Sequence, residues 1–270
     1  EELTVSKTAE TSYTREHFWD IDKTVDTENG YTLDGFPKIW LDGPGSAGDE
    51  TATWTIDVSY KGYEDRDFNV SGLITIENTG SLAAVITSVA DVLGGAPITV
   101  DCGVGFPHNL AVGATLTCTY SEDGYVEGLN EVTVTTERDQ YFANAAIVWG
   151  APTTVINETV NISDLSDLFG AVYLGTATAP NGAQFQYSKH FAWADYADSC
   201  GAGFQYANTA TIVETGQSAS ATLKVNVRCE ILDVSKTAET SYTREHFWDI
   251  DKSVDTENGH ELDGFPKIWL

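Results

Sequence analysis

The sequence predicts an all-β protein with two β-sandwich domains, followed by the opening strands of another copy of the first domain. Three observations support this prediction. Apolar and polar residues alternate along many short segments, as they do in half-buried strands. Dipeptides that favour tight hairpin turns separate these segments. The last 39 residues nearly repeat residues 3–41, and such self-similarity is typical of repeat architectures.

The alternation is clearest in residues 54–60, where one face carries two aromatic and two aliphatic side chains and the other only Thr, Asp and Ser. We expect further strands in residues 73–77, 131–135, 207–213 and 223–229. Asn-Gly or Asp-Gly pairs predict turns at residues 29–30, 34–35, 123–124 and 181–182. No window shows helical periodicity for more than a turn or two, so the pattern favours sandwiches.

Two related phrases, in residues 142–148 and 206–213, each resemble the closing strand of a domain. They predict a larger β-sandwich over residues 1–150 and a smaller one over residues 151–231. Gly and Pro punctuate the pattern between these two segments, at residues 149–152, and mark the boundary.

Residues 232–270 form the start of a second copy of the first domain, with 35 of 39 positions identical to residues 3–41. So short a segment cannot bury a core alone. We therefore expect either that further chain supplies the rest of another two-domain unit or that these strands complete a neighbouring molecule. Both alternatives make the chain one element of a head-to-tail series.

The chain is strongly acidic, with 41 Asp and Glu against 14 Lys and Arg and a formal charge of -27. Such a surface repels phosphate backbones and anionic lipids, which argues against nucleic-acid and membrane partners. No apolar run is long enough to span a bilayer. The sequence contains no Met, and we expect a mature or excised piece of an exported protein.

The four cysteines also favour export, because disulfides persist in oxidising compartments. Cys102 and Cys118 lie in two alternating segments and are placed to bond across a hairpin. Cys200 and Cys229 bracket the last part of the smaller domain. Pairing each with its near neighbour is the local solution among three connectivities; four reduced thiols in a cytosolic protein are the alternative.

Residues 70–91 (VSGLITIENTGSLAAVITSVAD), 101–107 (DCGVGFP) and 114–121 (ATLTCTYS) together resemble the immunoglobulin-like repeats of large prokaryotic surface proteins. The phrases VSKTA at residues 5–9 and WDIDK at residues 19–23 are similar to the first strands of such repeats. This resemblance implies tandem β-domains in an extracellular stalk, adhesin or filament, without enzymatic activity. It identifies no ligand.

The motifs of common enzymes are absent from the sequence, including H-E-x-x-H, G-x-S-x-G and phosphate-binding glycine loops, so we predict no catalytic residues and no cofactor. The densest acidic cluster contains Asp20, Asp22 and Asp26. Calcium prefers oxygen ligands of this kind but needs six to eight of them. A solvated acidic strand is the interpretation that we favour over a calcium site.

A second hypothesis is an intramolecular isopeptide bond between lysine and asparagine, as some surface-repeat families form. It requires a first-strand lysine, Lys7 or Lys23, an asparagine in a closing strand, Asn144 or Asn208, and a buried acid. The simpler interpretation is that these asparagines serve only strand-end hydrogen bonds.

Three sequons allow N-glycosylation, at Asn69, Asn157 and Asn161. For the whole chain we predict a non-enzymatic structural repeat of an extracellular filament or surface stalk, which assembles end to end with copies of itself. The alternative is an adhesin that binds a glycan or cell-surface ligand through exposed aromatic loop residues, such as those at 191–196.

Overall fold

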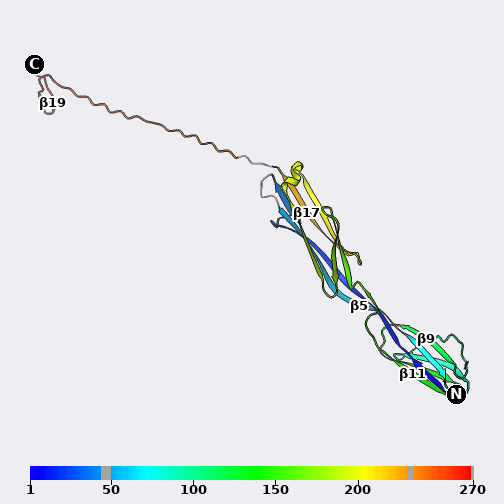
Figure 1. The fold of residues 1–270 in the computed structure, drawn as a ribbon. Coiled ribbons are helices and arrows are strands. Elements are labelled where there is room, and N and C mark those ends of the chain that lie inside the picture. Colours follow the sequence, from blue (N-terminus) through cyan, green and yellow to red (C-terminus); the bar gives the residue numbers. More distant parts are fainter. Residues whose placement is uncertain (44–49, 230–233, 269–270) are drawn as a thin grey trace. The chain divides into compact units, whose positions relative to one another are not determined.

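The computed structural model describes residues 1–43, 50–229 and 234–268 and confirms an all-β fold. The chain divides into two units, residues 1–230 and residues 231–270. The first unit contains two β-sandwiches, and Figure 1 shows their strands. The one helical element in the described residues is a short 3-10 helix, η1 (Trp193–Ser199).

Two long antiparallel strands, β2 (Glu10–Thr27) and β5 (Glu50–Asn78), form the centre of the first sheet and contribute to both sandwiches. Four shorter strands join them: β1 (Leu3–Lys7), β9 (Thr115–Asp123) and β15 (Ala183–Phe191) pair with β5, and β12 (Thr154–Ile156) pairs with β2. Two segments that were expected as separate strands, residues 54–60 and 73–77, are therefore parts of one strand.

The register between β2 and β5 shifts twice, because β5 has an extra residue opposite Ser12/Thr14 and another opposite Phe18/Trp19. Gly62 and Asp67 lie at these places with positive φ angles of 105° and 56°. Such bulges bend a strand and increase its twist without ending the pairing. They let β5 continue from one sandwich into the other.

The first sandwich packs one end of this sheet against a second sheet. The strands of the second sheet are β6 (Ala84–Leu93), β7 (Ala96–Ile98), β8 (His108–Leu110), β10 (Gly128–Thr136) and β11 (Gln140–Ile147). Alternate residues from both sheets fill one apolar core, in which Ile74, Ile76, Ile86 and Val134 are fully buried. This interdigitation is typical of aligned sandwiches.

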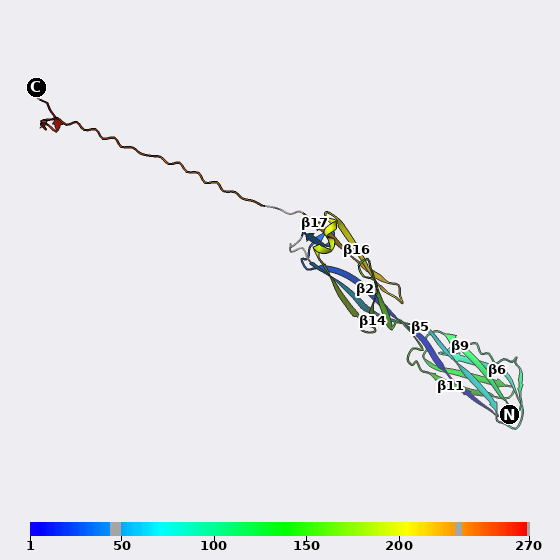
Figure 2. The same cartoon turned by 45° about the horizontal axis from the view of Figure 1, so that its top comes forward.

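The second sandwich packs the other end of the long strands against a third sheet, which Figure 2 shows from a second direction. Its strands are β3 (Thr32–Leu33), β4 (Phe36–Asp42), β13 (Thr159–Ser166), β14 (Gly170–Thr178), β16 (Gly203–Ile212) and β17 (Ser218–Arg228). Trp54 and Phe191 are the largest fully buried side chains of this sandwich.

The three buried apolar clusters do not follow the boundary expected near residue 150. Trp19, Ile21 and Ile56, which were expected in the larger domain, pack in one core with Val160 and Ile212 from the smaller one. Strand pairing explains why residues of the two expected domains share a core, because β15 pairs with β5 and β17 pairs in parallel with β4. The second sandwich is thus assembled from both ends of the first unit.

The second unit shows the repeated sequence in a different state. Residues 234–256 form no strand, and Trp248 and Ile250 are 92% and 94% exposed, whereas the matching Trp19 and Ile21 are 3% and 9% exposed. A small hairpin, β18 (Glu261–Leu262) with β19 (Phe265–Pro266), has the same register as β3 with the start of β4. The hairpin therefore forms from local sequence, while the long strand requires partners from elsewhere.

Replacement of Gly72 by alanine tests the packing of the first sandwich. The new Cβ would lie 2.2 Å from the carbonyl oxygen of Thr8 and 2.6 Å from the hydroxyl oxygen of Tyr120. We expect the free energy of unfolding to fall by about 1–3 kcal/mol, the usual range for overpacking, as measured by urea titration.

Gly105→Ala is the matched control, because nothing lies within 4 Å of its new Cβ. Equal stability of the two variants would contradict the close approach of β1, β5 and β9.

Candidate functional site

A buried lysine joins the two sheets of the second sandwich. Lys23 Nζ on β2 donates hydrogen bonds to Asp164 on β13 and to Asn208 Oδ1 on β16, the latter at 2.7 Å. Tyr187 on β15 completes the group, because its hydroxyl donates to Asp164 and accepts a 2.5 Å hydrogen bond from Asn208 Nδ2. The side chains of Lys23 and Asp164 are 0% and 3% exposed. We call these four residues the Lys23 cluster.

Burial shifts the pKa values of Lys23 and Tyr187. Desolvation lowers the pKa of Lys23, although the hydrogen bond and charge of Asp164 act in the opposite direction. The pKa of Tyr187 is raised, mainly by burial and secondly by the hydrogen bond to Asp164. Desolvation disfavours charged forms, so this lysine gives up its proton more readily than an exposed lysine, while the tyrosine remains a neutral donor.

A second buried lysine occupies the first sandwich. Lys7 on β1 forms an ion pair with Asp91 on β6, with an Nζ–Oδ2 distance of 2.6 Å and both side chains 0% exposed. Its Nζ lies 3.8 Å from the centre of the Tyr120 ring on β9. Asn130 on β10 is also fully buried. We call these four residues the Lys7 cluster.

Asn130 is the unusual member of the Lys7 cluster. Burial raises the pKa of Tyr120, and Asn130 lies close enough to its hydroxyl to act in the opposite direction. Yet neither amide atom of Asn130 reaches hydrogen-bonding geometry with any part of the chain that the structure describes. A buried polar group without a partner costs about 1–3 kcal/mol, and such groups are few in native proteins, so the position of Asn130 needs an explanation.

The structure brings together one of the predicted lysine–asparagine pairs and not the other. Lys23 contacts Asn208. Asn144 is not in the Lys7 cluster: it lies opposite Glu131 in the ladder between β10 and β11, and both residues are exposed. Residues 142–148 and 206–213 are similar in sequence, but Asn144 faces solvent and Asn208 faces the core. Their similarity therefore does not predict which asparagine is buried.

The remaining members of the two clusters were missed by sequence reasoning, although a signal exists. Asn130 shares the inward face of its strand with Val132 and Val134, and the same alternation surrounds Asp164 on β13. A polar residue on the apolar face of a strand predicts a buried polar group, which needs a partner. The period-2 pattern could have identified these residues.

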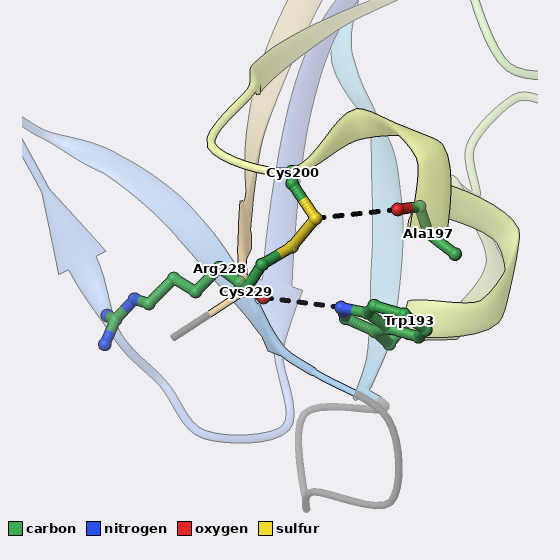
Figure 3. The surroundings of a disulfide bond; sticks show 5 residues. All are labelled: Trp193, Ala197, Cys200, Arg228 and Cys229. Atoms are coloured by element: carbon green, nitrogen blue, oxygen red, sulfur yellow. Dashed lines mark hydrogen bonds between the residues drawn. A yellow bond between two sulfur atoms is a disulfide. The ribbon is translucent and has the colours of Figure 1, made fainter. Parts of the chain in front are cut away.

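The disulfides are the locally paired ones, Cys102–Cys118 and Cys200–Cys229. The first lies in the core of the first sandwich. Figure 3 shows the second, which ties the end of η1 to the residue after β17. On the chain-entropy model a bridge that closes a loop of this order stabilises by about 3 kcal/mol.

The aromatic segment at residues 191–196 is not the exposed loop that an adhesin would use. Phe191 is fully buried, and Tyr196 packs against the same core. Trp193 Nε1 donates to the carbonyl oxygen of Arg228 at 3.3 Å, as Figure 3 shows. These side chains stabilise the end of the second sandwich, so the adhesin alternative loses the feature on which it was based.

The acidic residues of β2 are not grouped around a common point in the described residues. Asp20, Asp22 and Asp26 lie on the exposed face of the strand, as alternation predicts, and Asp20 pairs with Lys61 at 3.2 Å. Across residues 1–43, 50–229 and 234–268, no three His, Cys, Asp or Glu side chains are grouped so that they could hold a metal ion. The calcium hypothesis therefore has no support in the geometry.

The three sequon asparagines are partly buried. Asn69 Nδ2 donates to Ser121 and Asp123 at 2.9 Å each, and Asn161 Nδ2 donates to Glu214. A glycan on either side chain would have to replace these hydrogen bonds. Asn157 adopts a positive φ of 57° between β12 and β13.

Comparison of the chain with models of protein families and with curated proteins found no match to either. In the described residues, no helix has the length and apolar character needed to cross a membrane. The geometry of the two clusters therefore carries the functional argument. Each cluster places a lysine amine beside a carboxylate in a core that excludes water, and in the Lys23 cluster the amine also contacts an amide carbonyl oxygen.

The buried charge of the Lys23 cluster can be tested with one single and one double variant. Asp164→Leu leaves the amine of Lys23 buried without its counter-ion, whereas Lys23→Met combined with Asp164→Leu removes both charges. Uncompensated buried charges are strongly destabilising, but apolar replacement of a whole pair is often close to neutral. We expect the single variant to be less stable than the double variant by roughly 3 kcal/mol in urea unfolding.

Stability of the single variant equal to or above that of the double variant would show that Lys23 and Asp164 are not a desolvated pair.

Proposed function

We propose that this chain is a non-enzymatic structural repeat of an extracellular filament or surface stalk, which joins end to end with copies of itself. The observation that carries this proposal is the presence of one sequence in two states. Residues 3–41 supply β1, β2, β3 and β4 to the two sandwiches, while the nearly identical C-terminal copy exposes the same apolar side chains.

The exposed copy has the chemical character of an unsatisfied strand. Tyr242, Phe247, Trp248 and Ile250 are each more than 80% exposed. An extended segment also leaves its backbone hydrogen-bonding groups to solvent, whereas β2 pairs its own with β5. The same sequence that completes two sandwiches at one end is therefore available at the other end to begin or complete another copy.

Two features support a location outside the cell. Both disulfides are of the kind that persists in oxidising compartments, and the net charge of -27 favours solubility and opposes non-specific binding to anionic surfaces. Partners of the exposed segment are then copies of this chain, either covalently continuous with it or joined by strand addition to a sheet edge.

Limited digestion with trypsin tests whether the C-terminal copy awaits a partner. In the 270-residue chain we expect rapid cleavage after Lys236 and Lys252, which are exposed, and none after the buried Lys7 and Lys23. In a lengthened chain, with residues 42–230 appended after Leu270, the second copy should fold and resist cleavage at least 100-fold better. Mass spectrometry of the products measures both rates.

The N-terminal copy serves as the internal control in both digests, because its sequence around the cleaved bonds differs only in Thr24, which is Ser253 in the second copy. Equally fast cleavage of the second copy in the lengthened chain would contradict end-to-end assembly through this segment.

A further inference from the structure

We propose that each buried cluster is the site of an intramolecular isopeptide bond, between Lys23 and Asn208 in the second sandwich and between Lys7 and Asn130 in the first. This covalent modification goes beyond the proposed structural role and does not depend on it. A stalk could assemble without these bonds, and the bonds could form in a protein that does not assemble.

The two clusters occupy equivalent positions on the first sheet. Lys7 pairs with Ile74 of β5, which pairs with Cys118 of β9, and Tyr120 follows two residues later. In the second sandwich Lys23 pairs with Ile56 of β5, which pairs with Phe185 of β15, and Tyr187 follows two residues later. The lysine and tyrosine therefore have the same spacing across three antiparallel strands in both sandwiches.

The facing sheets repeat the equivalence. Asp91 of β6 pairs with Val132 of β10, and Asn130 precedes that partner by two residues. Asp164 of β13 pairs with Ala210 of β16, and Asn208 precedes that partner by two residues. Lysine, tyrosine, aspartate and asparagine thus occupy equivalent register positions in both sandwiches, although the two sandwiches differ in sequence. General packing requirements do not explain this agreement.

The Lys23 cluster shows the contacts that bond formation needs. The amine lies 2.7 Å from the carbonyl oxygen of Asn208 and also contacts the carboxylate of Asp164. Effective molarities are very high when reacting groups are held in this way. Burial also favours the neutral amine, which is the nucleophilic form, because desolvation lowers the lysine pKa.

In the Lys7 cluster the same role falls to Asn130 by its register. Its fully buried amide has no hydrogen-bond partner in the described residues, and Lys7 and Asp91 lie in the same core with 0% exposure. An amide bond to Lys7 would give this otherwise unsatisfied side chain a covalent partner. The pairing also explains why Asn144, on the exposed face of β11, is not needed.

The proposed step is balanced without any further reagent. The aspartate carboxylate accepts a proton from the lysine ammonium group, and the Nζ lone pair then attacks Cγ of asparagine. The protonated aspartic acid hydrogen-bonds the developing oxyanion and gives its proton to Nδ2. The carboxylate then relays the remaining extra proton from Nζ to the same nitrogen, the Cγ–Nδ2 bond breaks, and the leaving group departs as ammonium. One amide replaces another and the carboxylate is restored, so nothing is oxidised or reduced.

The intact mass of the purified chain tests the inference directly. After reduction of the disulfides, two bonds lower the mass by about 34 Da relative to the sequence, or about 17 Da for each ammonia lost. Asn208→Ala and Asn130→Ala should each halve this loss, and Asn144→Ala should leave it unchanged. Fragmentation of the linked peptides identifies the joined residues.

An unmodified mass for the wild-type chain would overturn the proposal without reference to any variant. A loss of one ammonia that maps to one cluster would overturn the assignment for the other. The C-terminal copy is an internal control: trypsin should release the identical peptide that ends at Lys252 but not the one that ends at Lys23.

Discussion

The antiparallel ladder between β2 and β5 is the interaction on which the remainder of the first unit depends. It runs from Glu10 opposite Ser71 to Thr27 opposite Ala52, and four further strands attach to its two members. Both sandwiches therefore share one pair of strands. Their registers also place Lys7 and Lys23, because each lysine lies opposite an isoleucine of β5 that is fully buried.

The repeated segment separates local from non-local causes of structure. The hairpin around Asp34-Gly35 recurs around Asp263-Gly264 with positive φ angles that agree within 3°, because Gly and Asp favour that turn wherever it occurs. The strand that becomes β2 has no such local support. Its alternating aromatic and charged side chains become a strand only where β5 and a facing sheet bury them.

The sequence predicts those parts of the fold that follow from local pattern. Period-2 alternation identifies parts of β5, β10, β16 and β17, Gly-containing pairs identify the turns at residues 29–30 and 34–35, and the local pairing of the cysteines is confirmed for both disulfides. It does not predict that β5 continues through residues 61–69, because a charged segment of this kind is typical of a loop. Pairing with β2 keeps these residues in the strand, which contains two bulges.

The candidate site was only partly predictable for the same reason. Lys23 and Asn208 were identified, but Asp164, Asp91 and Asn130 join their clusters through pairings between strands far apart in sequence. The choice of Asn144 shows the limit of phrase similarity, since a shift of one residue in a strand moves a side chain from core to solvent. The alternating pattern around Asn130 predicts a buried asparagine. The similarity between the segments that contain Asn144 and Asn208 does not.

Mechanical extension of single molecules, pulled by their ends, tests the proposal that a bond between β2 and β16 closes the second sandwich covalently. With Lys23 of β2 bonded to Asn208 of β16 and the Cys200–Cys229 disulfide intact, residues 24–199 lie outside the path of force, and the account predicts that they never contribute to the released length, even at forces that unfold ordinary sandwiches. An additional extension on the order of 600 Å, the span of that segment when fully extended, would contradict it.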